Sequence, residues 1–193
     1  MSNHQASQQM VGYLYQMQYA LKLLLDNDNC NSQISIEKFD DVAFVEEGTP
    51  KKFIQLKHHG KSGKLTDGST DLWRTLKVWL DEIKKSPGLL KDTKFLIITT
   101  AEAPKGTAAS YLKSDVRNEE EAYSKLRNIC NSSRNKTNAK FYNSFLETRE
   151  DILRQLISKI YVIDNASNII DVEKEIRSSI KYSCIKKFEN QVY

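Results

Sequence analysis

The sequence of residues 33–59, QISIEKFDDVAFVEEGTPKKFIQLKHH, decides the fold. Apolar and polar residues alternate over 33–38 and 41–46, the pattern of half-buried β-strands, and 52–58 is the third strand-like segment. Glu47-Gly48-Thr49-Pro50 supplies a turn between the second and third segments. Three short strands joined by short connections predict an antiparallel meander.

Helices and a further strand are predicted on both sides of this meander. Residues 1 to about 7 are expected to form a polar tail, and residues 8–25 a helix. One buried face of this helix is expected from the helical spacing of its apolar residues, Val11, Leu14, Tyr15, Met17, Leu21 and Leu25. After the meander, the continuous apolar run Phe95-Leu96-Ile97-Ile98 within 94–100 predicts a buried central strand.

A second helix is predicted over 69–85. Ser69 or Thr70 can cap its start, and Ser86-Pro87-Gly88 ends it. Its apolar stripe is predicted to consist of Leu72, Leu76, Trp79, Leu80 and Ile83. Trp73 falls at the edge of this stripe and is expected to pack against the first helix.

The second half of the chain is expected to be mostly helical, over 118–130, 138–146, 149–160 and 172–181, with a short strand at 160–164. The expected fold class is therefore α/β. It comprises a core of helix, three-strand meander, helix and central strand over about 8–100, followed by a mostly helical extension over about 104–193. A single domain spanning 1–193 suits this length.

Composition narrows the function classes only modestly. The formal net charge is +4, which permits a polyanionic partner without requiring one. The cysteines, Cys30, Cys130 and Cys184, are odd in number and far apart, which argues against a disulfide framework or a zinc site. No signal peptide or membrane-spanning run is evident, so we expect a cytoplasmic protein with no membrane partner.

Asp41, Gln55 and Lys57 are the candidate catalytic residues. Gln55 and Lys57 are two apart on one predicted strand and so project from the same face, and Asp41 begins the neighbouring strand. Phosphodiester hydrolysis needs hard oxygen ligands for a divalent cation, and magnesium takes one or two from protein and keeps several waters. Asp41 and the Gln55 oxygen would be metal ligands, with the Leu56 carbonyl a third, while Lys57 would orient the attacking water.

Four motifs carry a resemblance to a known family: GYLYQ at 12–16, IEKFDDV at 36–42, QLKHH at 55–59 and DLW at 71–73. In this order they resemble the PD-(D/E)XK nuclease superfamily, in its QxK, Mrr-like branch. More narrowly, they resemble the N-terminal nuclease domain of bacterial anti-phage (CBASS) effectors, over roughly 10–79. The resemblance implies a restriction-endonuclease-like core, cleavage of double-stranded DNA with low sequence specificity, and Mg²⁺ or Mn²⁺ as cofactor. In those effectors a SAVED domain that senses a cyclic oligonucleotide follows the nuclease, which implies an excised domain or a separate sensor subunit here.

The resemblance also implies supporting residues. It matches Asp41, Gln55 and Lys57 to the metal ligand, the metal-side amide and the catalytic lysine, and Gln16 to a polar residue of the first helix that lines such sites. Around these, the sequence adds candidate supporting residues Glu37, Asp40 and His58, and candidate DNA-binding residues His59, Lys61 and Lys64. Self-association is expected, because one such site cuts one strand.

Several alternatives stay open. Asp40 could replace Asp41 as the principal ligand, although Asp41 leaves Val42 and Phe44 together on the opposite, apolar face. Gln in place of the usual Glu removes a negative charge and weakens metal binding, so the chain could instead be an inactive nucleic-acid-binding or scaffold module. The metal chemistry does not depend on the sugar, so an RNase or a structure-specific nuclease is a further alternative.

Overall fold

The computed structural model describes residues 3–27, 32–37, 41–46, 48–58 and 63–189. In chain order its first elements are α1 (Asn3–Leu25), β1 (Gln33–Ile36), β2 (Val42–Glu46), β3 (Thr49–Lys57), α2 (Thr70–Lys85), α3 (Leu89–Asp92) and β4 (Lys94–Thr99). They are followed by α4 (Ala108–Tyr111), α5 (Glu119–Ser132), α6 (Ala139–Leu146), α7 (Glu150–Lys159), β5 (Ile160–Ile163) and α8 (Ile169–Glu189). The α/β class and the predicted order of helix, meander, helix and central strand are confirmed.

The five strands form one mixed sheet in the order β1-β2-β3-β4-β5. The β1, β2 and β3 strands pair antiparallel, as the meander prediction requires, while β4 lies parallel to both β3 and β5. The β4 strand is therefore central, as predicted from its apolar run. The last strand, β5, comes from the segment predicted as a mostly helical extension, so that segment contributes to the sheet itself.

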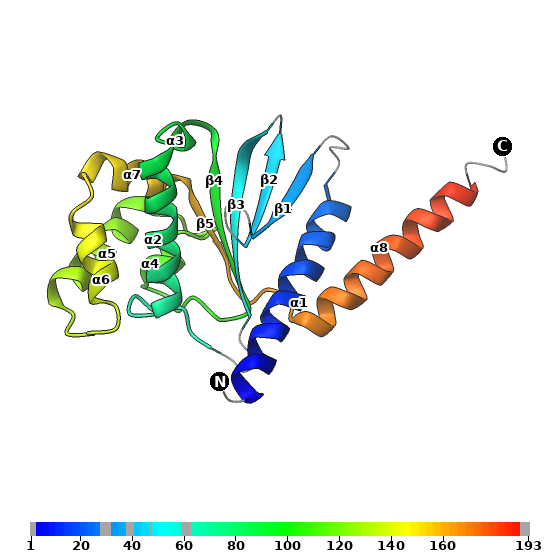
Figure 1. Ribbon diagram of the computed structural model, residues 1–193, viewed down its shortest axis with the longest axis horizontal. Coiled ribbons are helices and arrows are strands. Elements are labelled where there is room, and N and C mark those ends of the chain that lie inside the picture. The colour runs from blue at the N-terminus through cyan, green and yellow to red at the C-terminus, as the bar shows by residue number, and fades with distance from the viewer. Residues whose placement is uncertain (1–2, 28–31, 38–40, 47, 59–62, 190–193) are drawn as a thin grey trace.

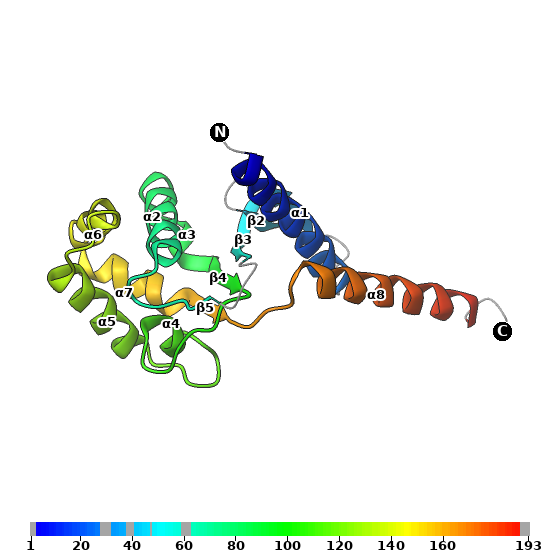
Figure 2. The ribbon, with the colours of Figure 1, turned by 90° about the horizontal axis from the view of Figure 1, so that it is seen from below.

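Helices cover both faces of the sheet. On one face, α2 and α5–α7 pack over a core that includes Ala43, Phe53 and Ile97. On the other, α1 and the start of α8 pack over residues that include Ile54 and Leu56 (Figures 1 and 2). Because side chains alternate along β3 after its register shift, the odd-numbered residues from Phe53 to Lys57 face α2 and the even-numbered residues among 52–56 face α1.

The α2 helix has the predicted stripe, and all five of its apolar residues are buried. Ser69 is its N-cap residue, but its hydroxyl accepts from the N–H of Thr66 instead of capping the helix. The expectation for Trp73 is wrong: the indole is fully buried and meets Tyr142 and Phe145 of α6 edge-on, at ring-centroid distances of 4.7 and 5.5 Å. The helical extension covers α2 on that side, so Trp73 packs there and not against α1.

The expected orientation of α1 is also wrong. The helix begins at Asn3, within the predicted polar tail. Of the six residues predicted to be buried, only Tyr15 is, and the residues buried beside it are Tyr19 and Ala20. The two tyrosine rings contact each other at 5.5 Å, so a pair of aromatic residues one turn apart forms the inward face. Most of the apolar residues of α1 consequently lie on its exposed side.

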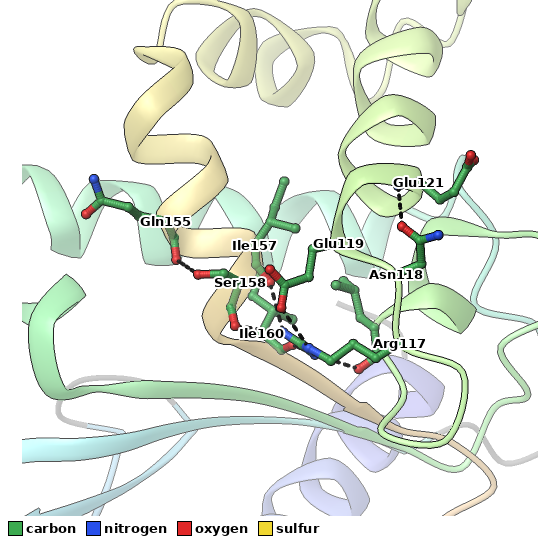
Figure 3. A network of polar contacts seen from close by, with 9 residues as sticks. Arg117, Asn118, Glu119, Glu121, Gln155, Ile157, Ser158 and Ile160 are labelled. Atoms are coloured by element: carbon green, nitrogen blue, oxygen red, sulfur yellow. Dashed lines mark hydrogen bonds and ion pairs between the residues drawn. The ribbon is translucent and has the colours of Figure 1, made fainter.

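In the second half, Arg117 joins three elements (Figure 3). Its guanidinium donates to the carbonyls of Ser158 at 2.7 Å and Ile160 at 2.8 Å, and to the Glu119 carboxylate at 2.9 Å. The same group lies over the Tyr161 ring, 4.2 Å from its centroid. The Arg117 guanidinium thus provides hydrogen-bond donors for carbonyls at the C-terminal end of α7, where the helix dipole favours positive charge.

The remaining helices agree with prediction within a few residues, except that α8 extends to Glu189. The four-residue helices α3 and α4 are additional. Searching the described residues for a helix with the length and hydropathy of a membrane span finds none.

Candidate functional site

Asp41 and Gln55 meet where β2 begins and β3 approaches its end. Asp41 directly precedes β2, and the pairing of Val42 with Ile54 places it opposite Gln55 across the antiparallel ladder. Gln55 is only 4% exposed and faces α2. A buried glutamine among apolar neighbours requires polar partners, because an unpaired amide in such a place is costly.

Two donors of β3 converge on one carboxylate oxygen. Asp41 Oδ2 accepts a short hydrogen bond from Nε2 of Gln55 and a second from the backbone N–H of Leu56, at 2.9 Å. Both donors belong to β3, so this strand holds the Asp41 carboxylate in place beside the start of β2. The sequence-predicted pair of Asp41 and Gln55 is therefore in direct contact.

The other end of the Gln55 amide points to Thr75 of α2. Thr75 Oγ1 lies 3.4 Å from Gln55 Oε1 and donates at 2.8 Å to the carbonyl of Asp71. A hydroxyl has one proton but can also accept, so Thr75 can bind either the oxygen or the nitrogen of the amide. The amide can therefore turn over and present its oxygen to Asp41 without losing its partner on α2.

Thr75 is the residue that sequence reasoning missed. It lies three residues after Leu72 and four before Trp79, which places it within the buried stripe of α2. A polar side chain at a stripe position was the available signal, since buried polar groups need a partner.

Lys57 is the last residue of β3 and is partly exposed. It lies on the Gln55 face by strand alternation, and its carbonyl accepts from the N–H of Thr100 at 3.1 Å, which ties the strand end to β4. Leu56 directs its N–H toward Asp41. In a strand the N–H and C=O of one residue point to the same side, so the Leu56 carbonyl is directed to the Asp41 side as well.

Other predicted site residues lie apart from this contact. The His58 ring packs on Tyr15 of α1 at 4.8 Å, on the opposite face of the sheet. Burial, with nearby Tyr19 and Glu175, raises the pKa of Tyr15, so the phenol stays neutral there. Gln16 is on the same helix, and within the described residues no hydrogen bond joins it to Asp41 or Gln55.

The structure describes only some of the predicted site residues that lie in turns and loops. Glu37 has a φ of 59°, and its N–H donates to the carbonyl of Asp41 at 3.1 Å. Lys64 is exposed and bridges Glu102 through the backbone. The predicted residues Asp40, His59 and Lys61 lie outside the described residues.

A divalent cation fits this donor set with one rearrangement. Asp41, the Leu56 carbonyl and, after its amide turns over, the Gln55 oxygen would provide hard oxygen ligands of the kind magnesium prefers. Within the part of the chain that the structure describes, no three His, Cys, Asp or Glu side chains gather as a metal-binding group. Among the described residues, the site would rely on one carboxylate, one amide and one backbone carbonyl.

Comparisons with known proteins give a distant structural similarity. No protein-family model matches the chain, and no curated protein sequence matches it significantly. Among solved structures, it is similar to the Moraxella osloensis Cap4 SAVED/CARF-domain containing receptor, with 16% sequence identity and a TM-score of 0.46. The similarity covers 89% of this chain and 37% of the receptor, so the chain spans little more than a third of the receptor's length.

Proposed function

We propose that this chain is a metal-dependent nuclease domain that hydrolyses phosphodiester bonds of double-stranded DNA with little sequence preference. The observation that carries the proposal is the contact of the Asp41 carboxylate with both Gln55 and Leu56 of the QLK motif. In this contact the carboxylate accepts from the side chain of Gln55 and from the backbone of Leu56, and Lys57 follows next along the strand. The motif order described above supports the same class of enzyme.

Each residue has a defined task in this proposal. Asp41, the Gln55 oxygen and the Leu56 carbonyl would hold Mg²⁺ or Mn²⁺, and Thr75 would remain the hydrogen-bond partner of the Gln55 amide on α2. A cation bound there supplies a water of lowered pKa and offsets negative charge on the phosphate. The Lys57 ammonium orients the attacking water and stabilises the charge that develops on the phosphate oxygens.

The substrate and partners belong to the proposal as well. Contacts are made mainly to phosphates, with Lys64 and the neighbouring His59 and Lys61 as candidates, because no element dedicated to groove recognition was identified in the sequence. Two copies act together to cut both strands. A linked or separate sensor that responds to a cyclic oligonucleotide, and a role in anti-phage defence, follow from the family resemblance.

Plasmid cleavage tests the proposal. The wild-type chain should nick supercoiled DNA with Mg²⁺ or Mn²⁺ and lose this activity with EDTA. Lys57→Ala should lower the rate at least about a thousandfold, since charge stabilisation at the reacting group is removed. Lys51→Ala removes the same charge from the other end of β3 and should cut as the wild type does. Undiminished cleavage by folded Lys57→Ala would exclude Lys57 from the mechanism.

One observation favours a second candidate, an inactive DNA-binding or scaffold module. The Gln55 amide turns its nitrogen to Asp41, so the carboxylate is already satisfied by protein donors. A module of this kind would bind DNA yet neither nick plasmid nor bind Mg²⁺ at Asp41. Parallel digestion of plasmid, single-stranded DNA and RNA distinguishes the proposed DNase from an RNase.

A further inference from the structure

The outward side of α1 is an exposed apolar stripe. We define the α1 stripe as five residues that are between 42% and 67% exposed: Met10, Leu14, Met17, Leu21 and Leu24. Three further exposed apolar side chains flank it, Val11, Tyr13 and Leu25. Scattered exposed apolar residues are ordinary on a soluble protein, but a contiguous row along a helix marks an interaction surface.

The rest of the described domain does not cover this stripe. Tyr15 and Tyr19 point to the other side of α1, where the Tyr15 hydroxyl donates to the carbonyl of Ser167 at 2.9 Å. Lys22 is on that side too and pairs with Glu175 of α8 at 3.4 Å. The α8 helix therefore contacts α1 on the side away from the stripe, and Figure 2 shows it diverging from α1.

The spacing of the stripe suits another helix. Its residues are separated by four, three, four and three positions, which is the repeat that forms the seam between two packed helices. The row is nearly symmetric about Met17: Met10 and Leu24 each lie seven positions from it, and Leu14 and Leu21 lie three and four positions from it. A second copy of α1 running antiparallel would place Met17 opposite itself, as a two-fold axis requires, with Met10 opposite Leu24 and Leu14 within one position of Leu21.

The near absence of charged residues on α1 also favours a second copy of this helix as the partner of the stripe. Lys22 is the only Lys, Arg, Asp or Glu among its 23 residues, and it faces α8. Interface cores are depleted in charge and enriched in Met and Tyr relative to ordinary surface. Two copies of an uncharged face can approach without like-charge repulsion, and an antiparallel pair also opposes the two helix dipoles.

The area is sufficient for a stable pair. The α1 stripe and its flanking residues expose on the order of 700 Å², close to the roughly 800 Å² that each partner buries in an interface of standard size. A contact of this size exceeds most lattice contacts and lies within the range of specific dimers.

We propose that the α1 stripe is the interface of a homodimer in which the two α1 helices pack antiparallel about Met17. The proposed function has two copies acting together, and this pairing names the surface that would join them. It does not depend on cleavage, because it concerns the sheet face opposite to Gln55 and can be measured without substrate.

The molar mass of the 193-residue chain in solution tests the pairing, by light scattering and sedimentation over a concentration series. The wild type should approach twice 22.2 kDa as concentration rises. Leu14→Lys/Leu21→Lys should weaken dimerisation at least about a hundredfold, since four charges enter the apolar seam. The matched control Leu146→Lys/Ile180→Lys adds the same charges at exposed apolar positions outside α1 and should dimerise as the wild type does.

Circular dichroism verifies that each variant is folded. A wild type that stays monomeric throughout would overturn the proposal and assign the stripe to a partner of another kind. A folded Leu14→Lys/Leu21→Lys variant that dimerises normally, or a control that is equally weakened, would overturn it as well.

A mixing experiment tests the antiparallel arrangement. Met10→Glu and Leu24→Lys each weaken their own homodimer, but a mixed antiparallel dimer places the two new charges opposite each other. Mixing should therefore restore dimerisation to well above the level of either variant alone. No gain on mixing would overturn the antiparallel pairing, because in a parallel dimer positions 10 and 24 never meet.

Discussion

Gln55→Glu is the perturbation that most directly examines the candidate site. In the structure the Gln55 amide donates to the Asp41 carboxylate within a buried part of the sheet. Replacing the amide by a carboxylate removes the donor and places two negative charges in contact. The same change supplies the additional charge that a divalent cation prefers.

The magnitude follows from this geometry. Two charges about 4 Å apart at an effective dielectric constant of about 20 repel by about 4 kcal/mol. At neutral pH the new glutamate can instead take up a proton, which requires its pKa to rise from about 4.3 to about 7. That shift corresponds to about the same free energy, so protonation limits the loss of stability to about this value. We therefore expect Gln55→Glu to lower the free energy of unfolding by about 4 kcal/mol without metal, or the Tm by about 8–16 °C for a domain of this size.

Thermal unfolding followed by circular dichroism measures the effect, with EDTA in one series and Mg²⁺ or Mn²⁺ in another. Metal should restore most of the lost Tm in Gln55→Glu, because a cation that binds only the folded state stabilises it. The deficit should also vanish below about pH 4, where the glutamate is protonated in the folded and unfolded states alike. Gln155→Glu, at an exposed position of α7, adds the same charge and should show neither effect.

Two results would refute different parts of the reasoning. Wild-type stability of Gln55→Glu in EDTA would mean that Asp41 and position 55 are not in contact. Destabilisation without rescue by Mg²⁺ or Mn²⁺ would uphold the contact and exclude the cation site.

Two further predictions concern Thr75 of α2 and Arg117, which directly precedes the N-cap of α5. Thr75→Val should weaken the apparent affinity for activating Mg²⁺ about tenfold in the nicking assay, because the Gln55 amide loses its partner on α2, whereas Thr75→Ser should retain it. Arg117→Met should lower the free energy of unfolding in urea by about 3 kcal/mol, because it leaves carbonyls at the end of α7 without donors. Arg149→Met, at a guanidinium that is largely exposed, should change the unfolding free energy little, and equal losses in the two variants would contradict the role given to Arg117.

Much of the fold could be predicted from short-range pattern. Short strand-like segments separated by turn residues predicted the three strands of the meander, and the apolar spacing before Pro87 predicted α2 and its buried stripe. The presence of Gln55 and Lys57 on one face follows from the same alternation, since it depends only on the two-residue period of a strand. These features are local, and neighbouring residues largely determine them.

The neighbours against which these helices pack could not be predicted, because they come from distant parts of the chain. An apolar pattern shows that a helix has a face to bury but not which neighbour will cover it. The sequence therefore gave the wrong buried face for α1, where the sheet receives Tyr15 and Tyr19, and the wrong partner for Trp73, which α6 covers from about 70 residues away.

The candidate site divides in the same way. Which oxygen and ammonium groups lie along β3 follows from the order of its residues, because strand geometry is set residue by residue. That the Gln55 amide is held between Asp41 and Thr75 depends on the folded chain, since the pairing of β2 with β3 and the packing of α2 on the sheet bring those groups together.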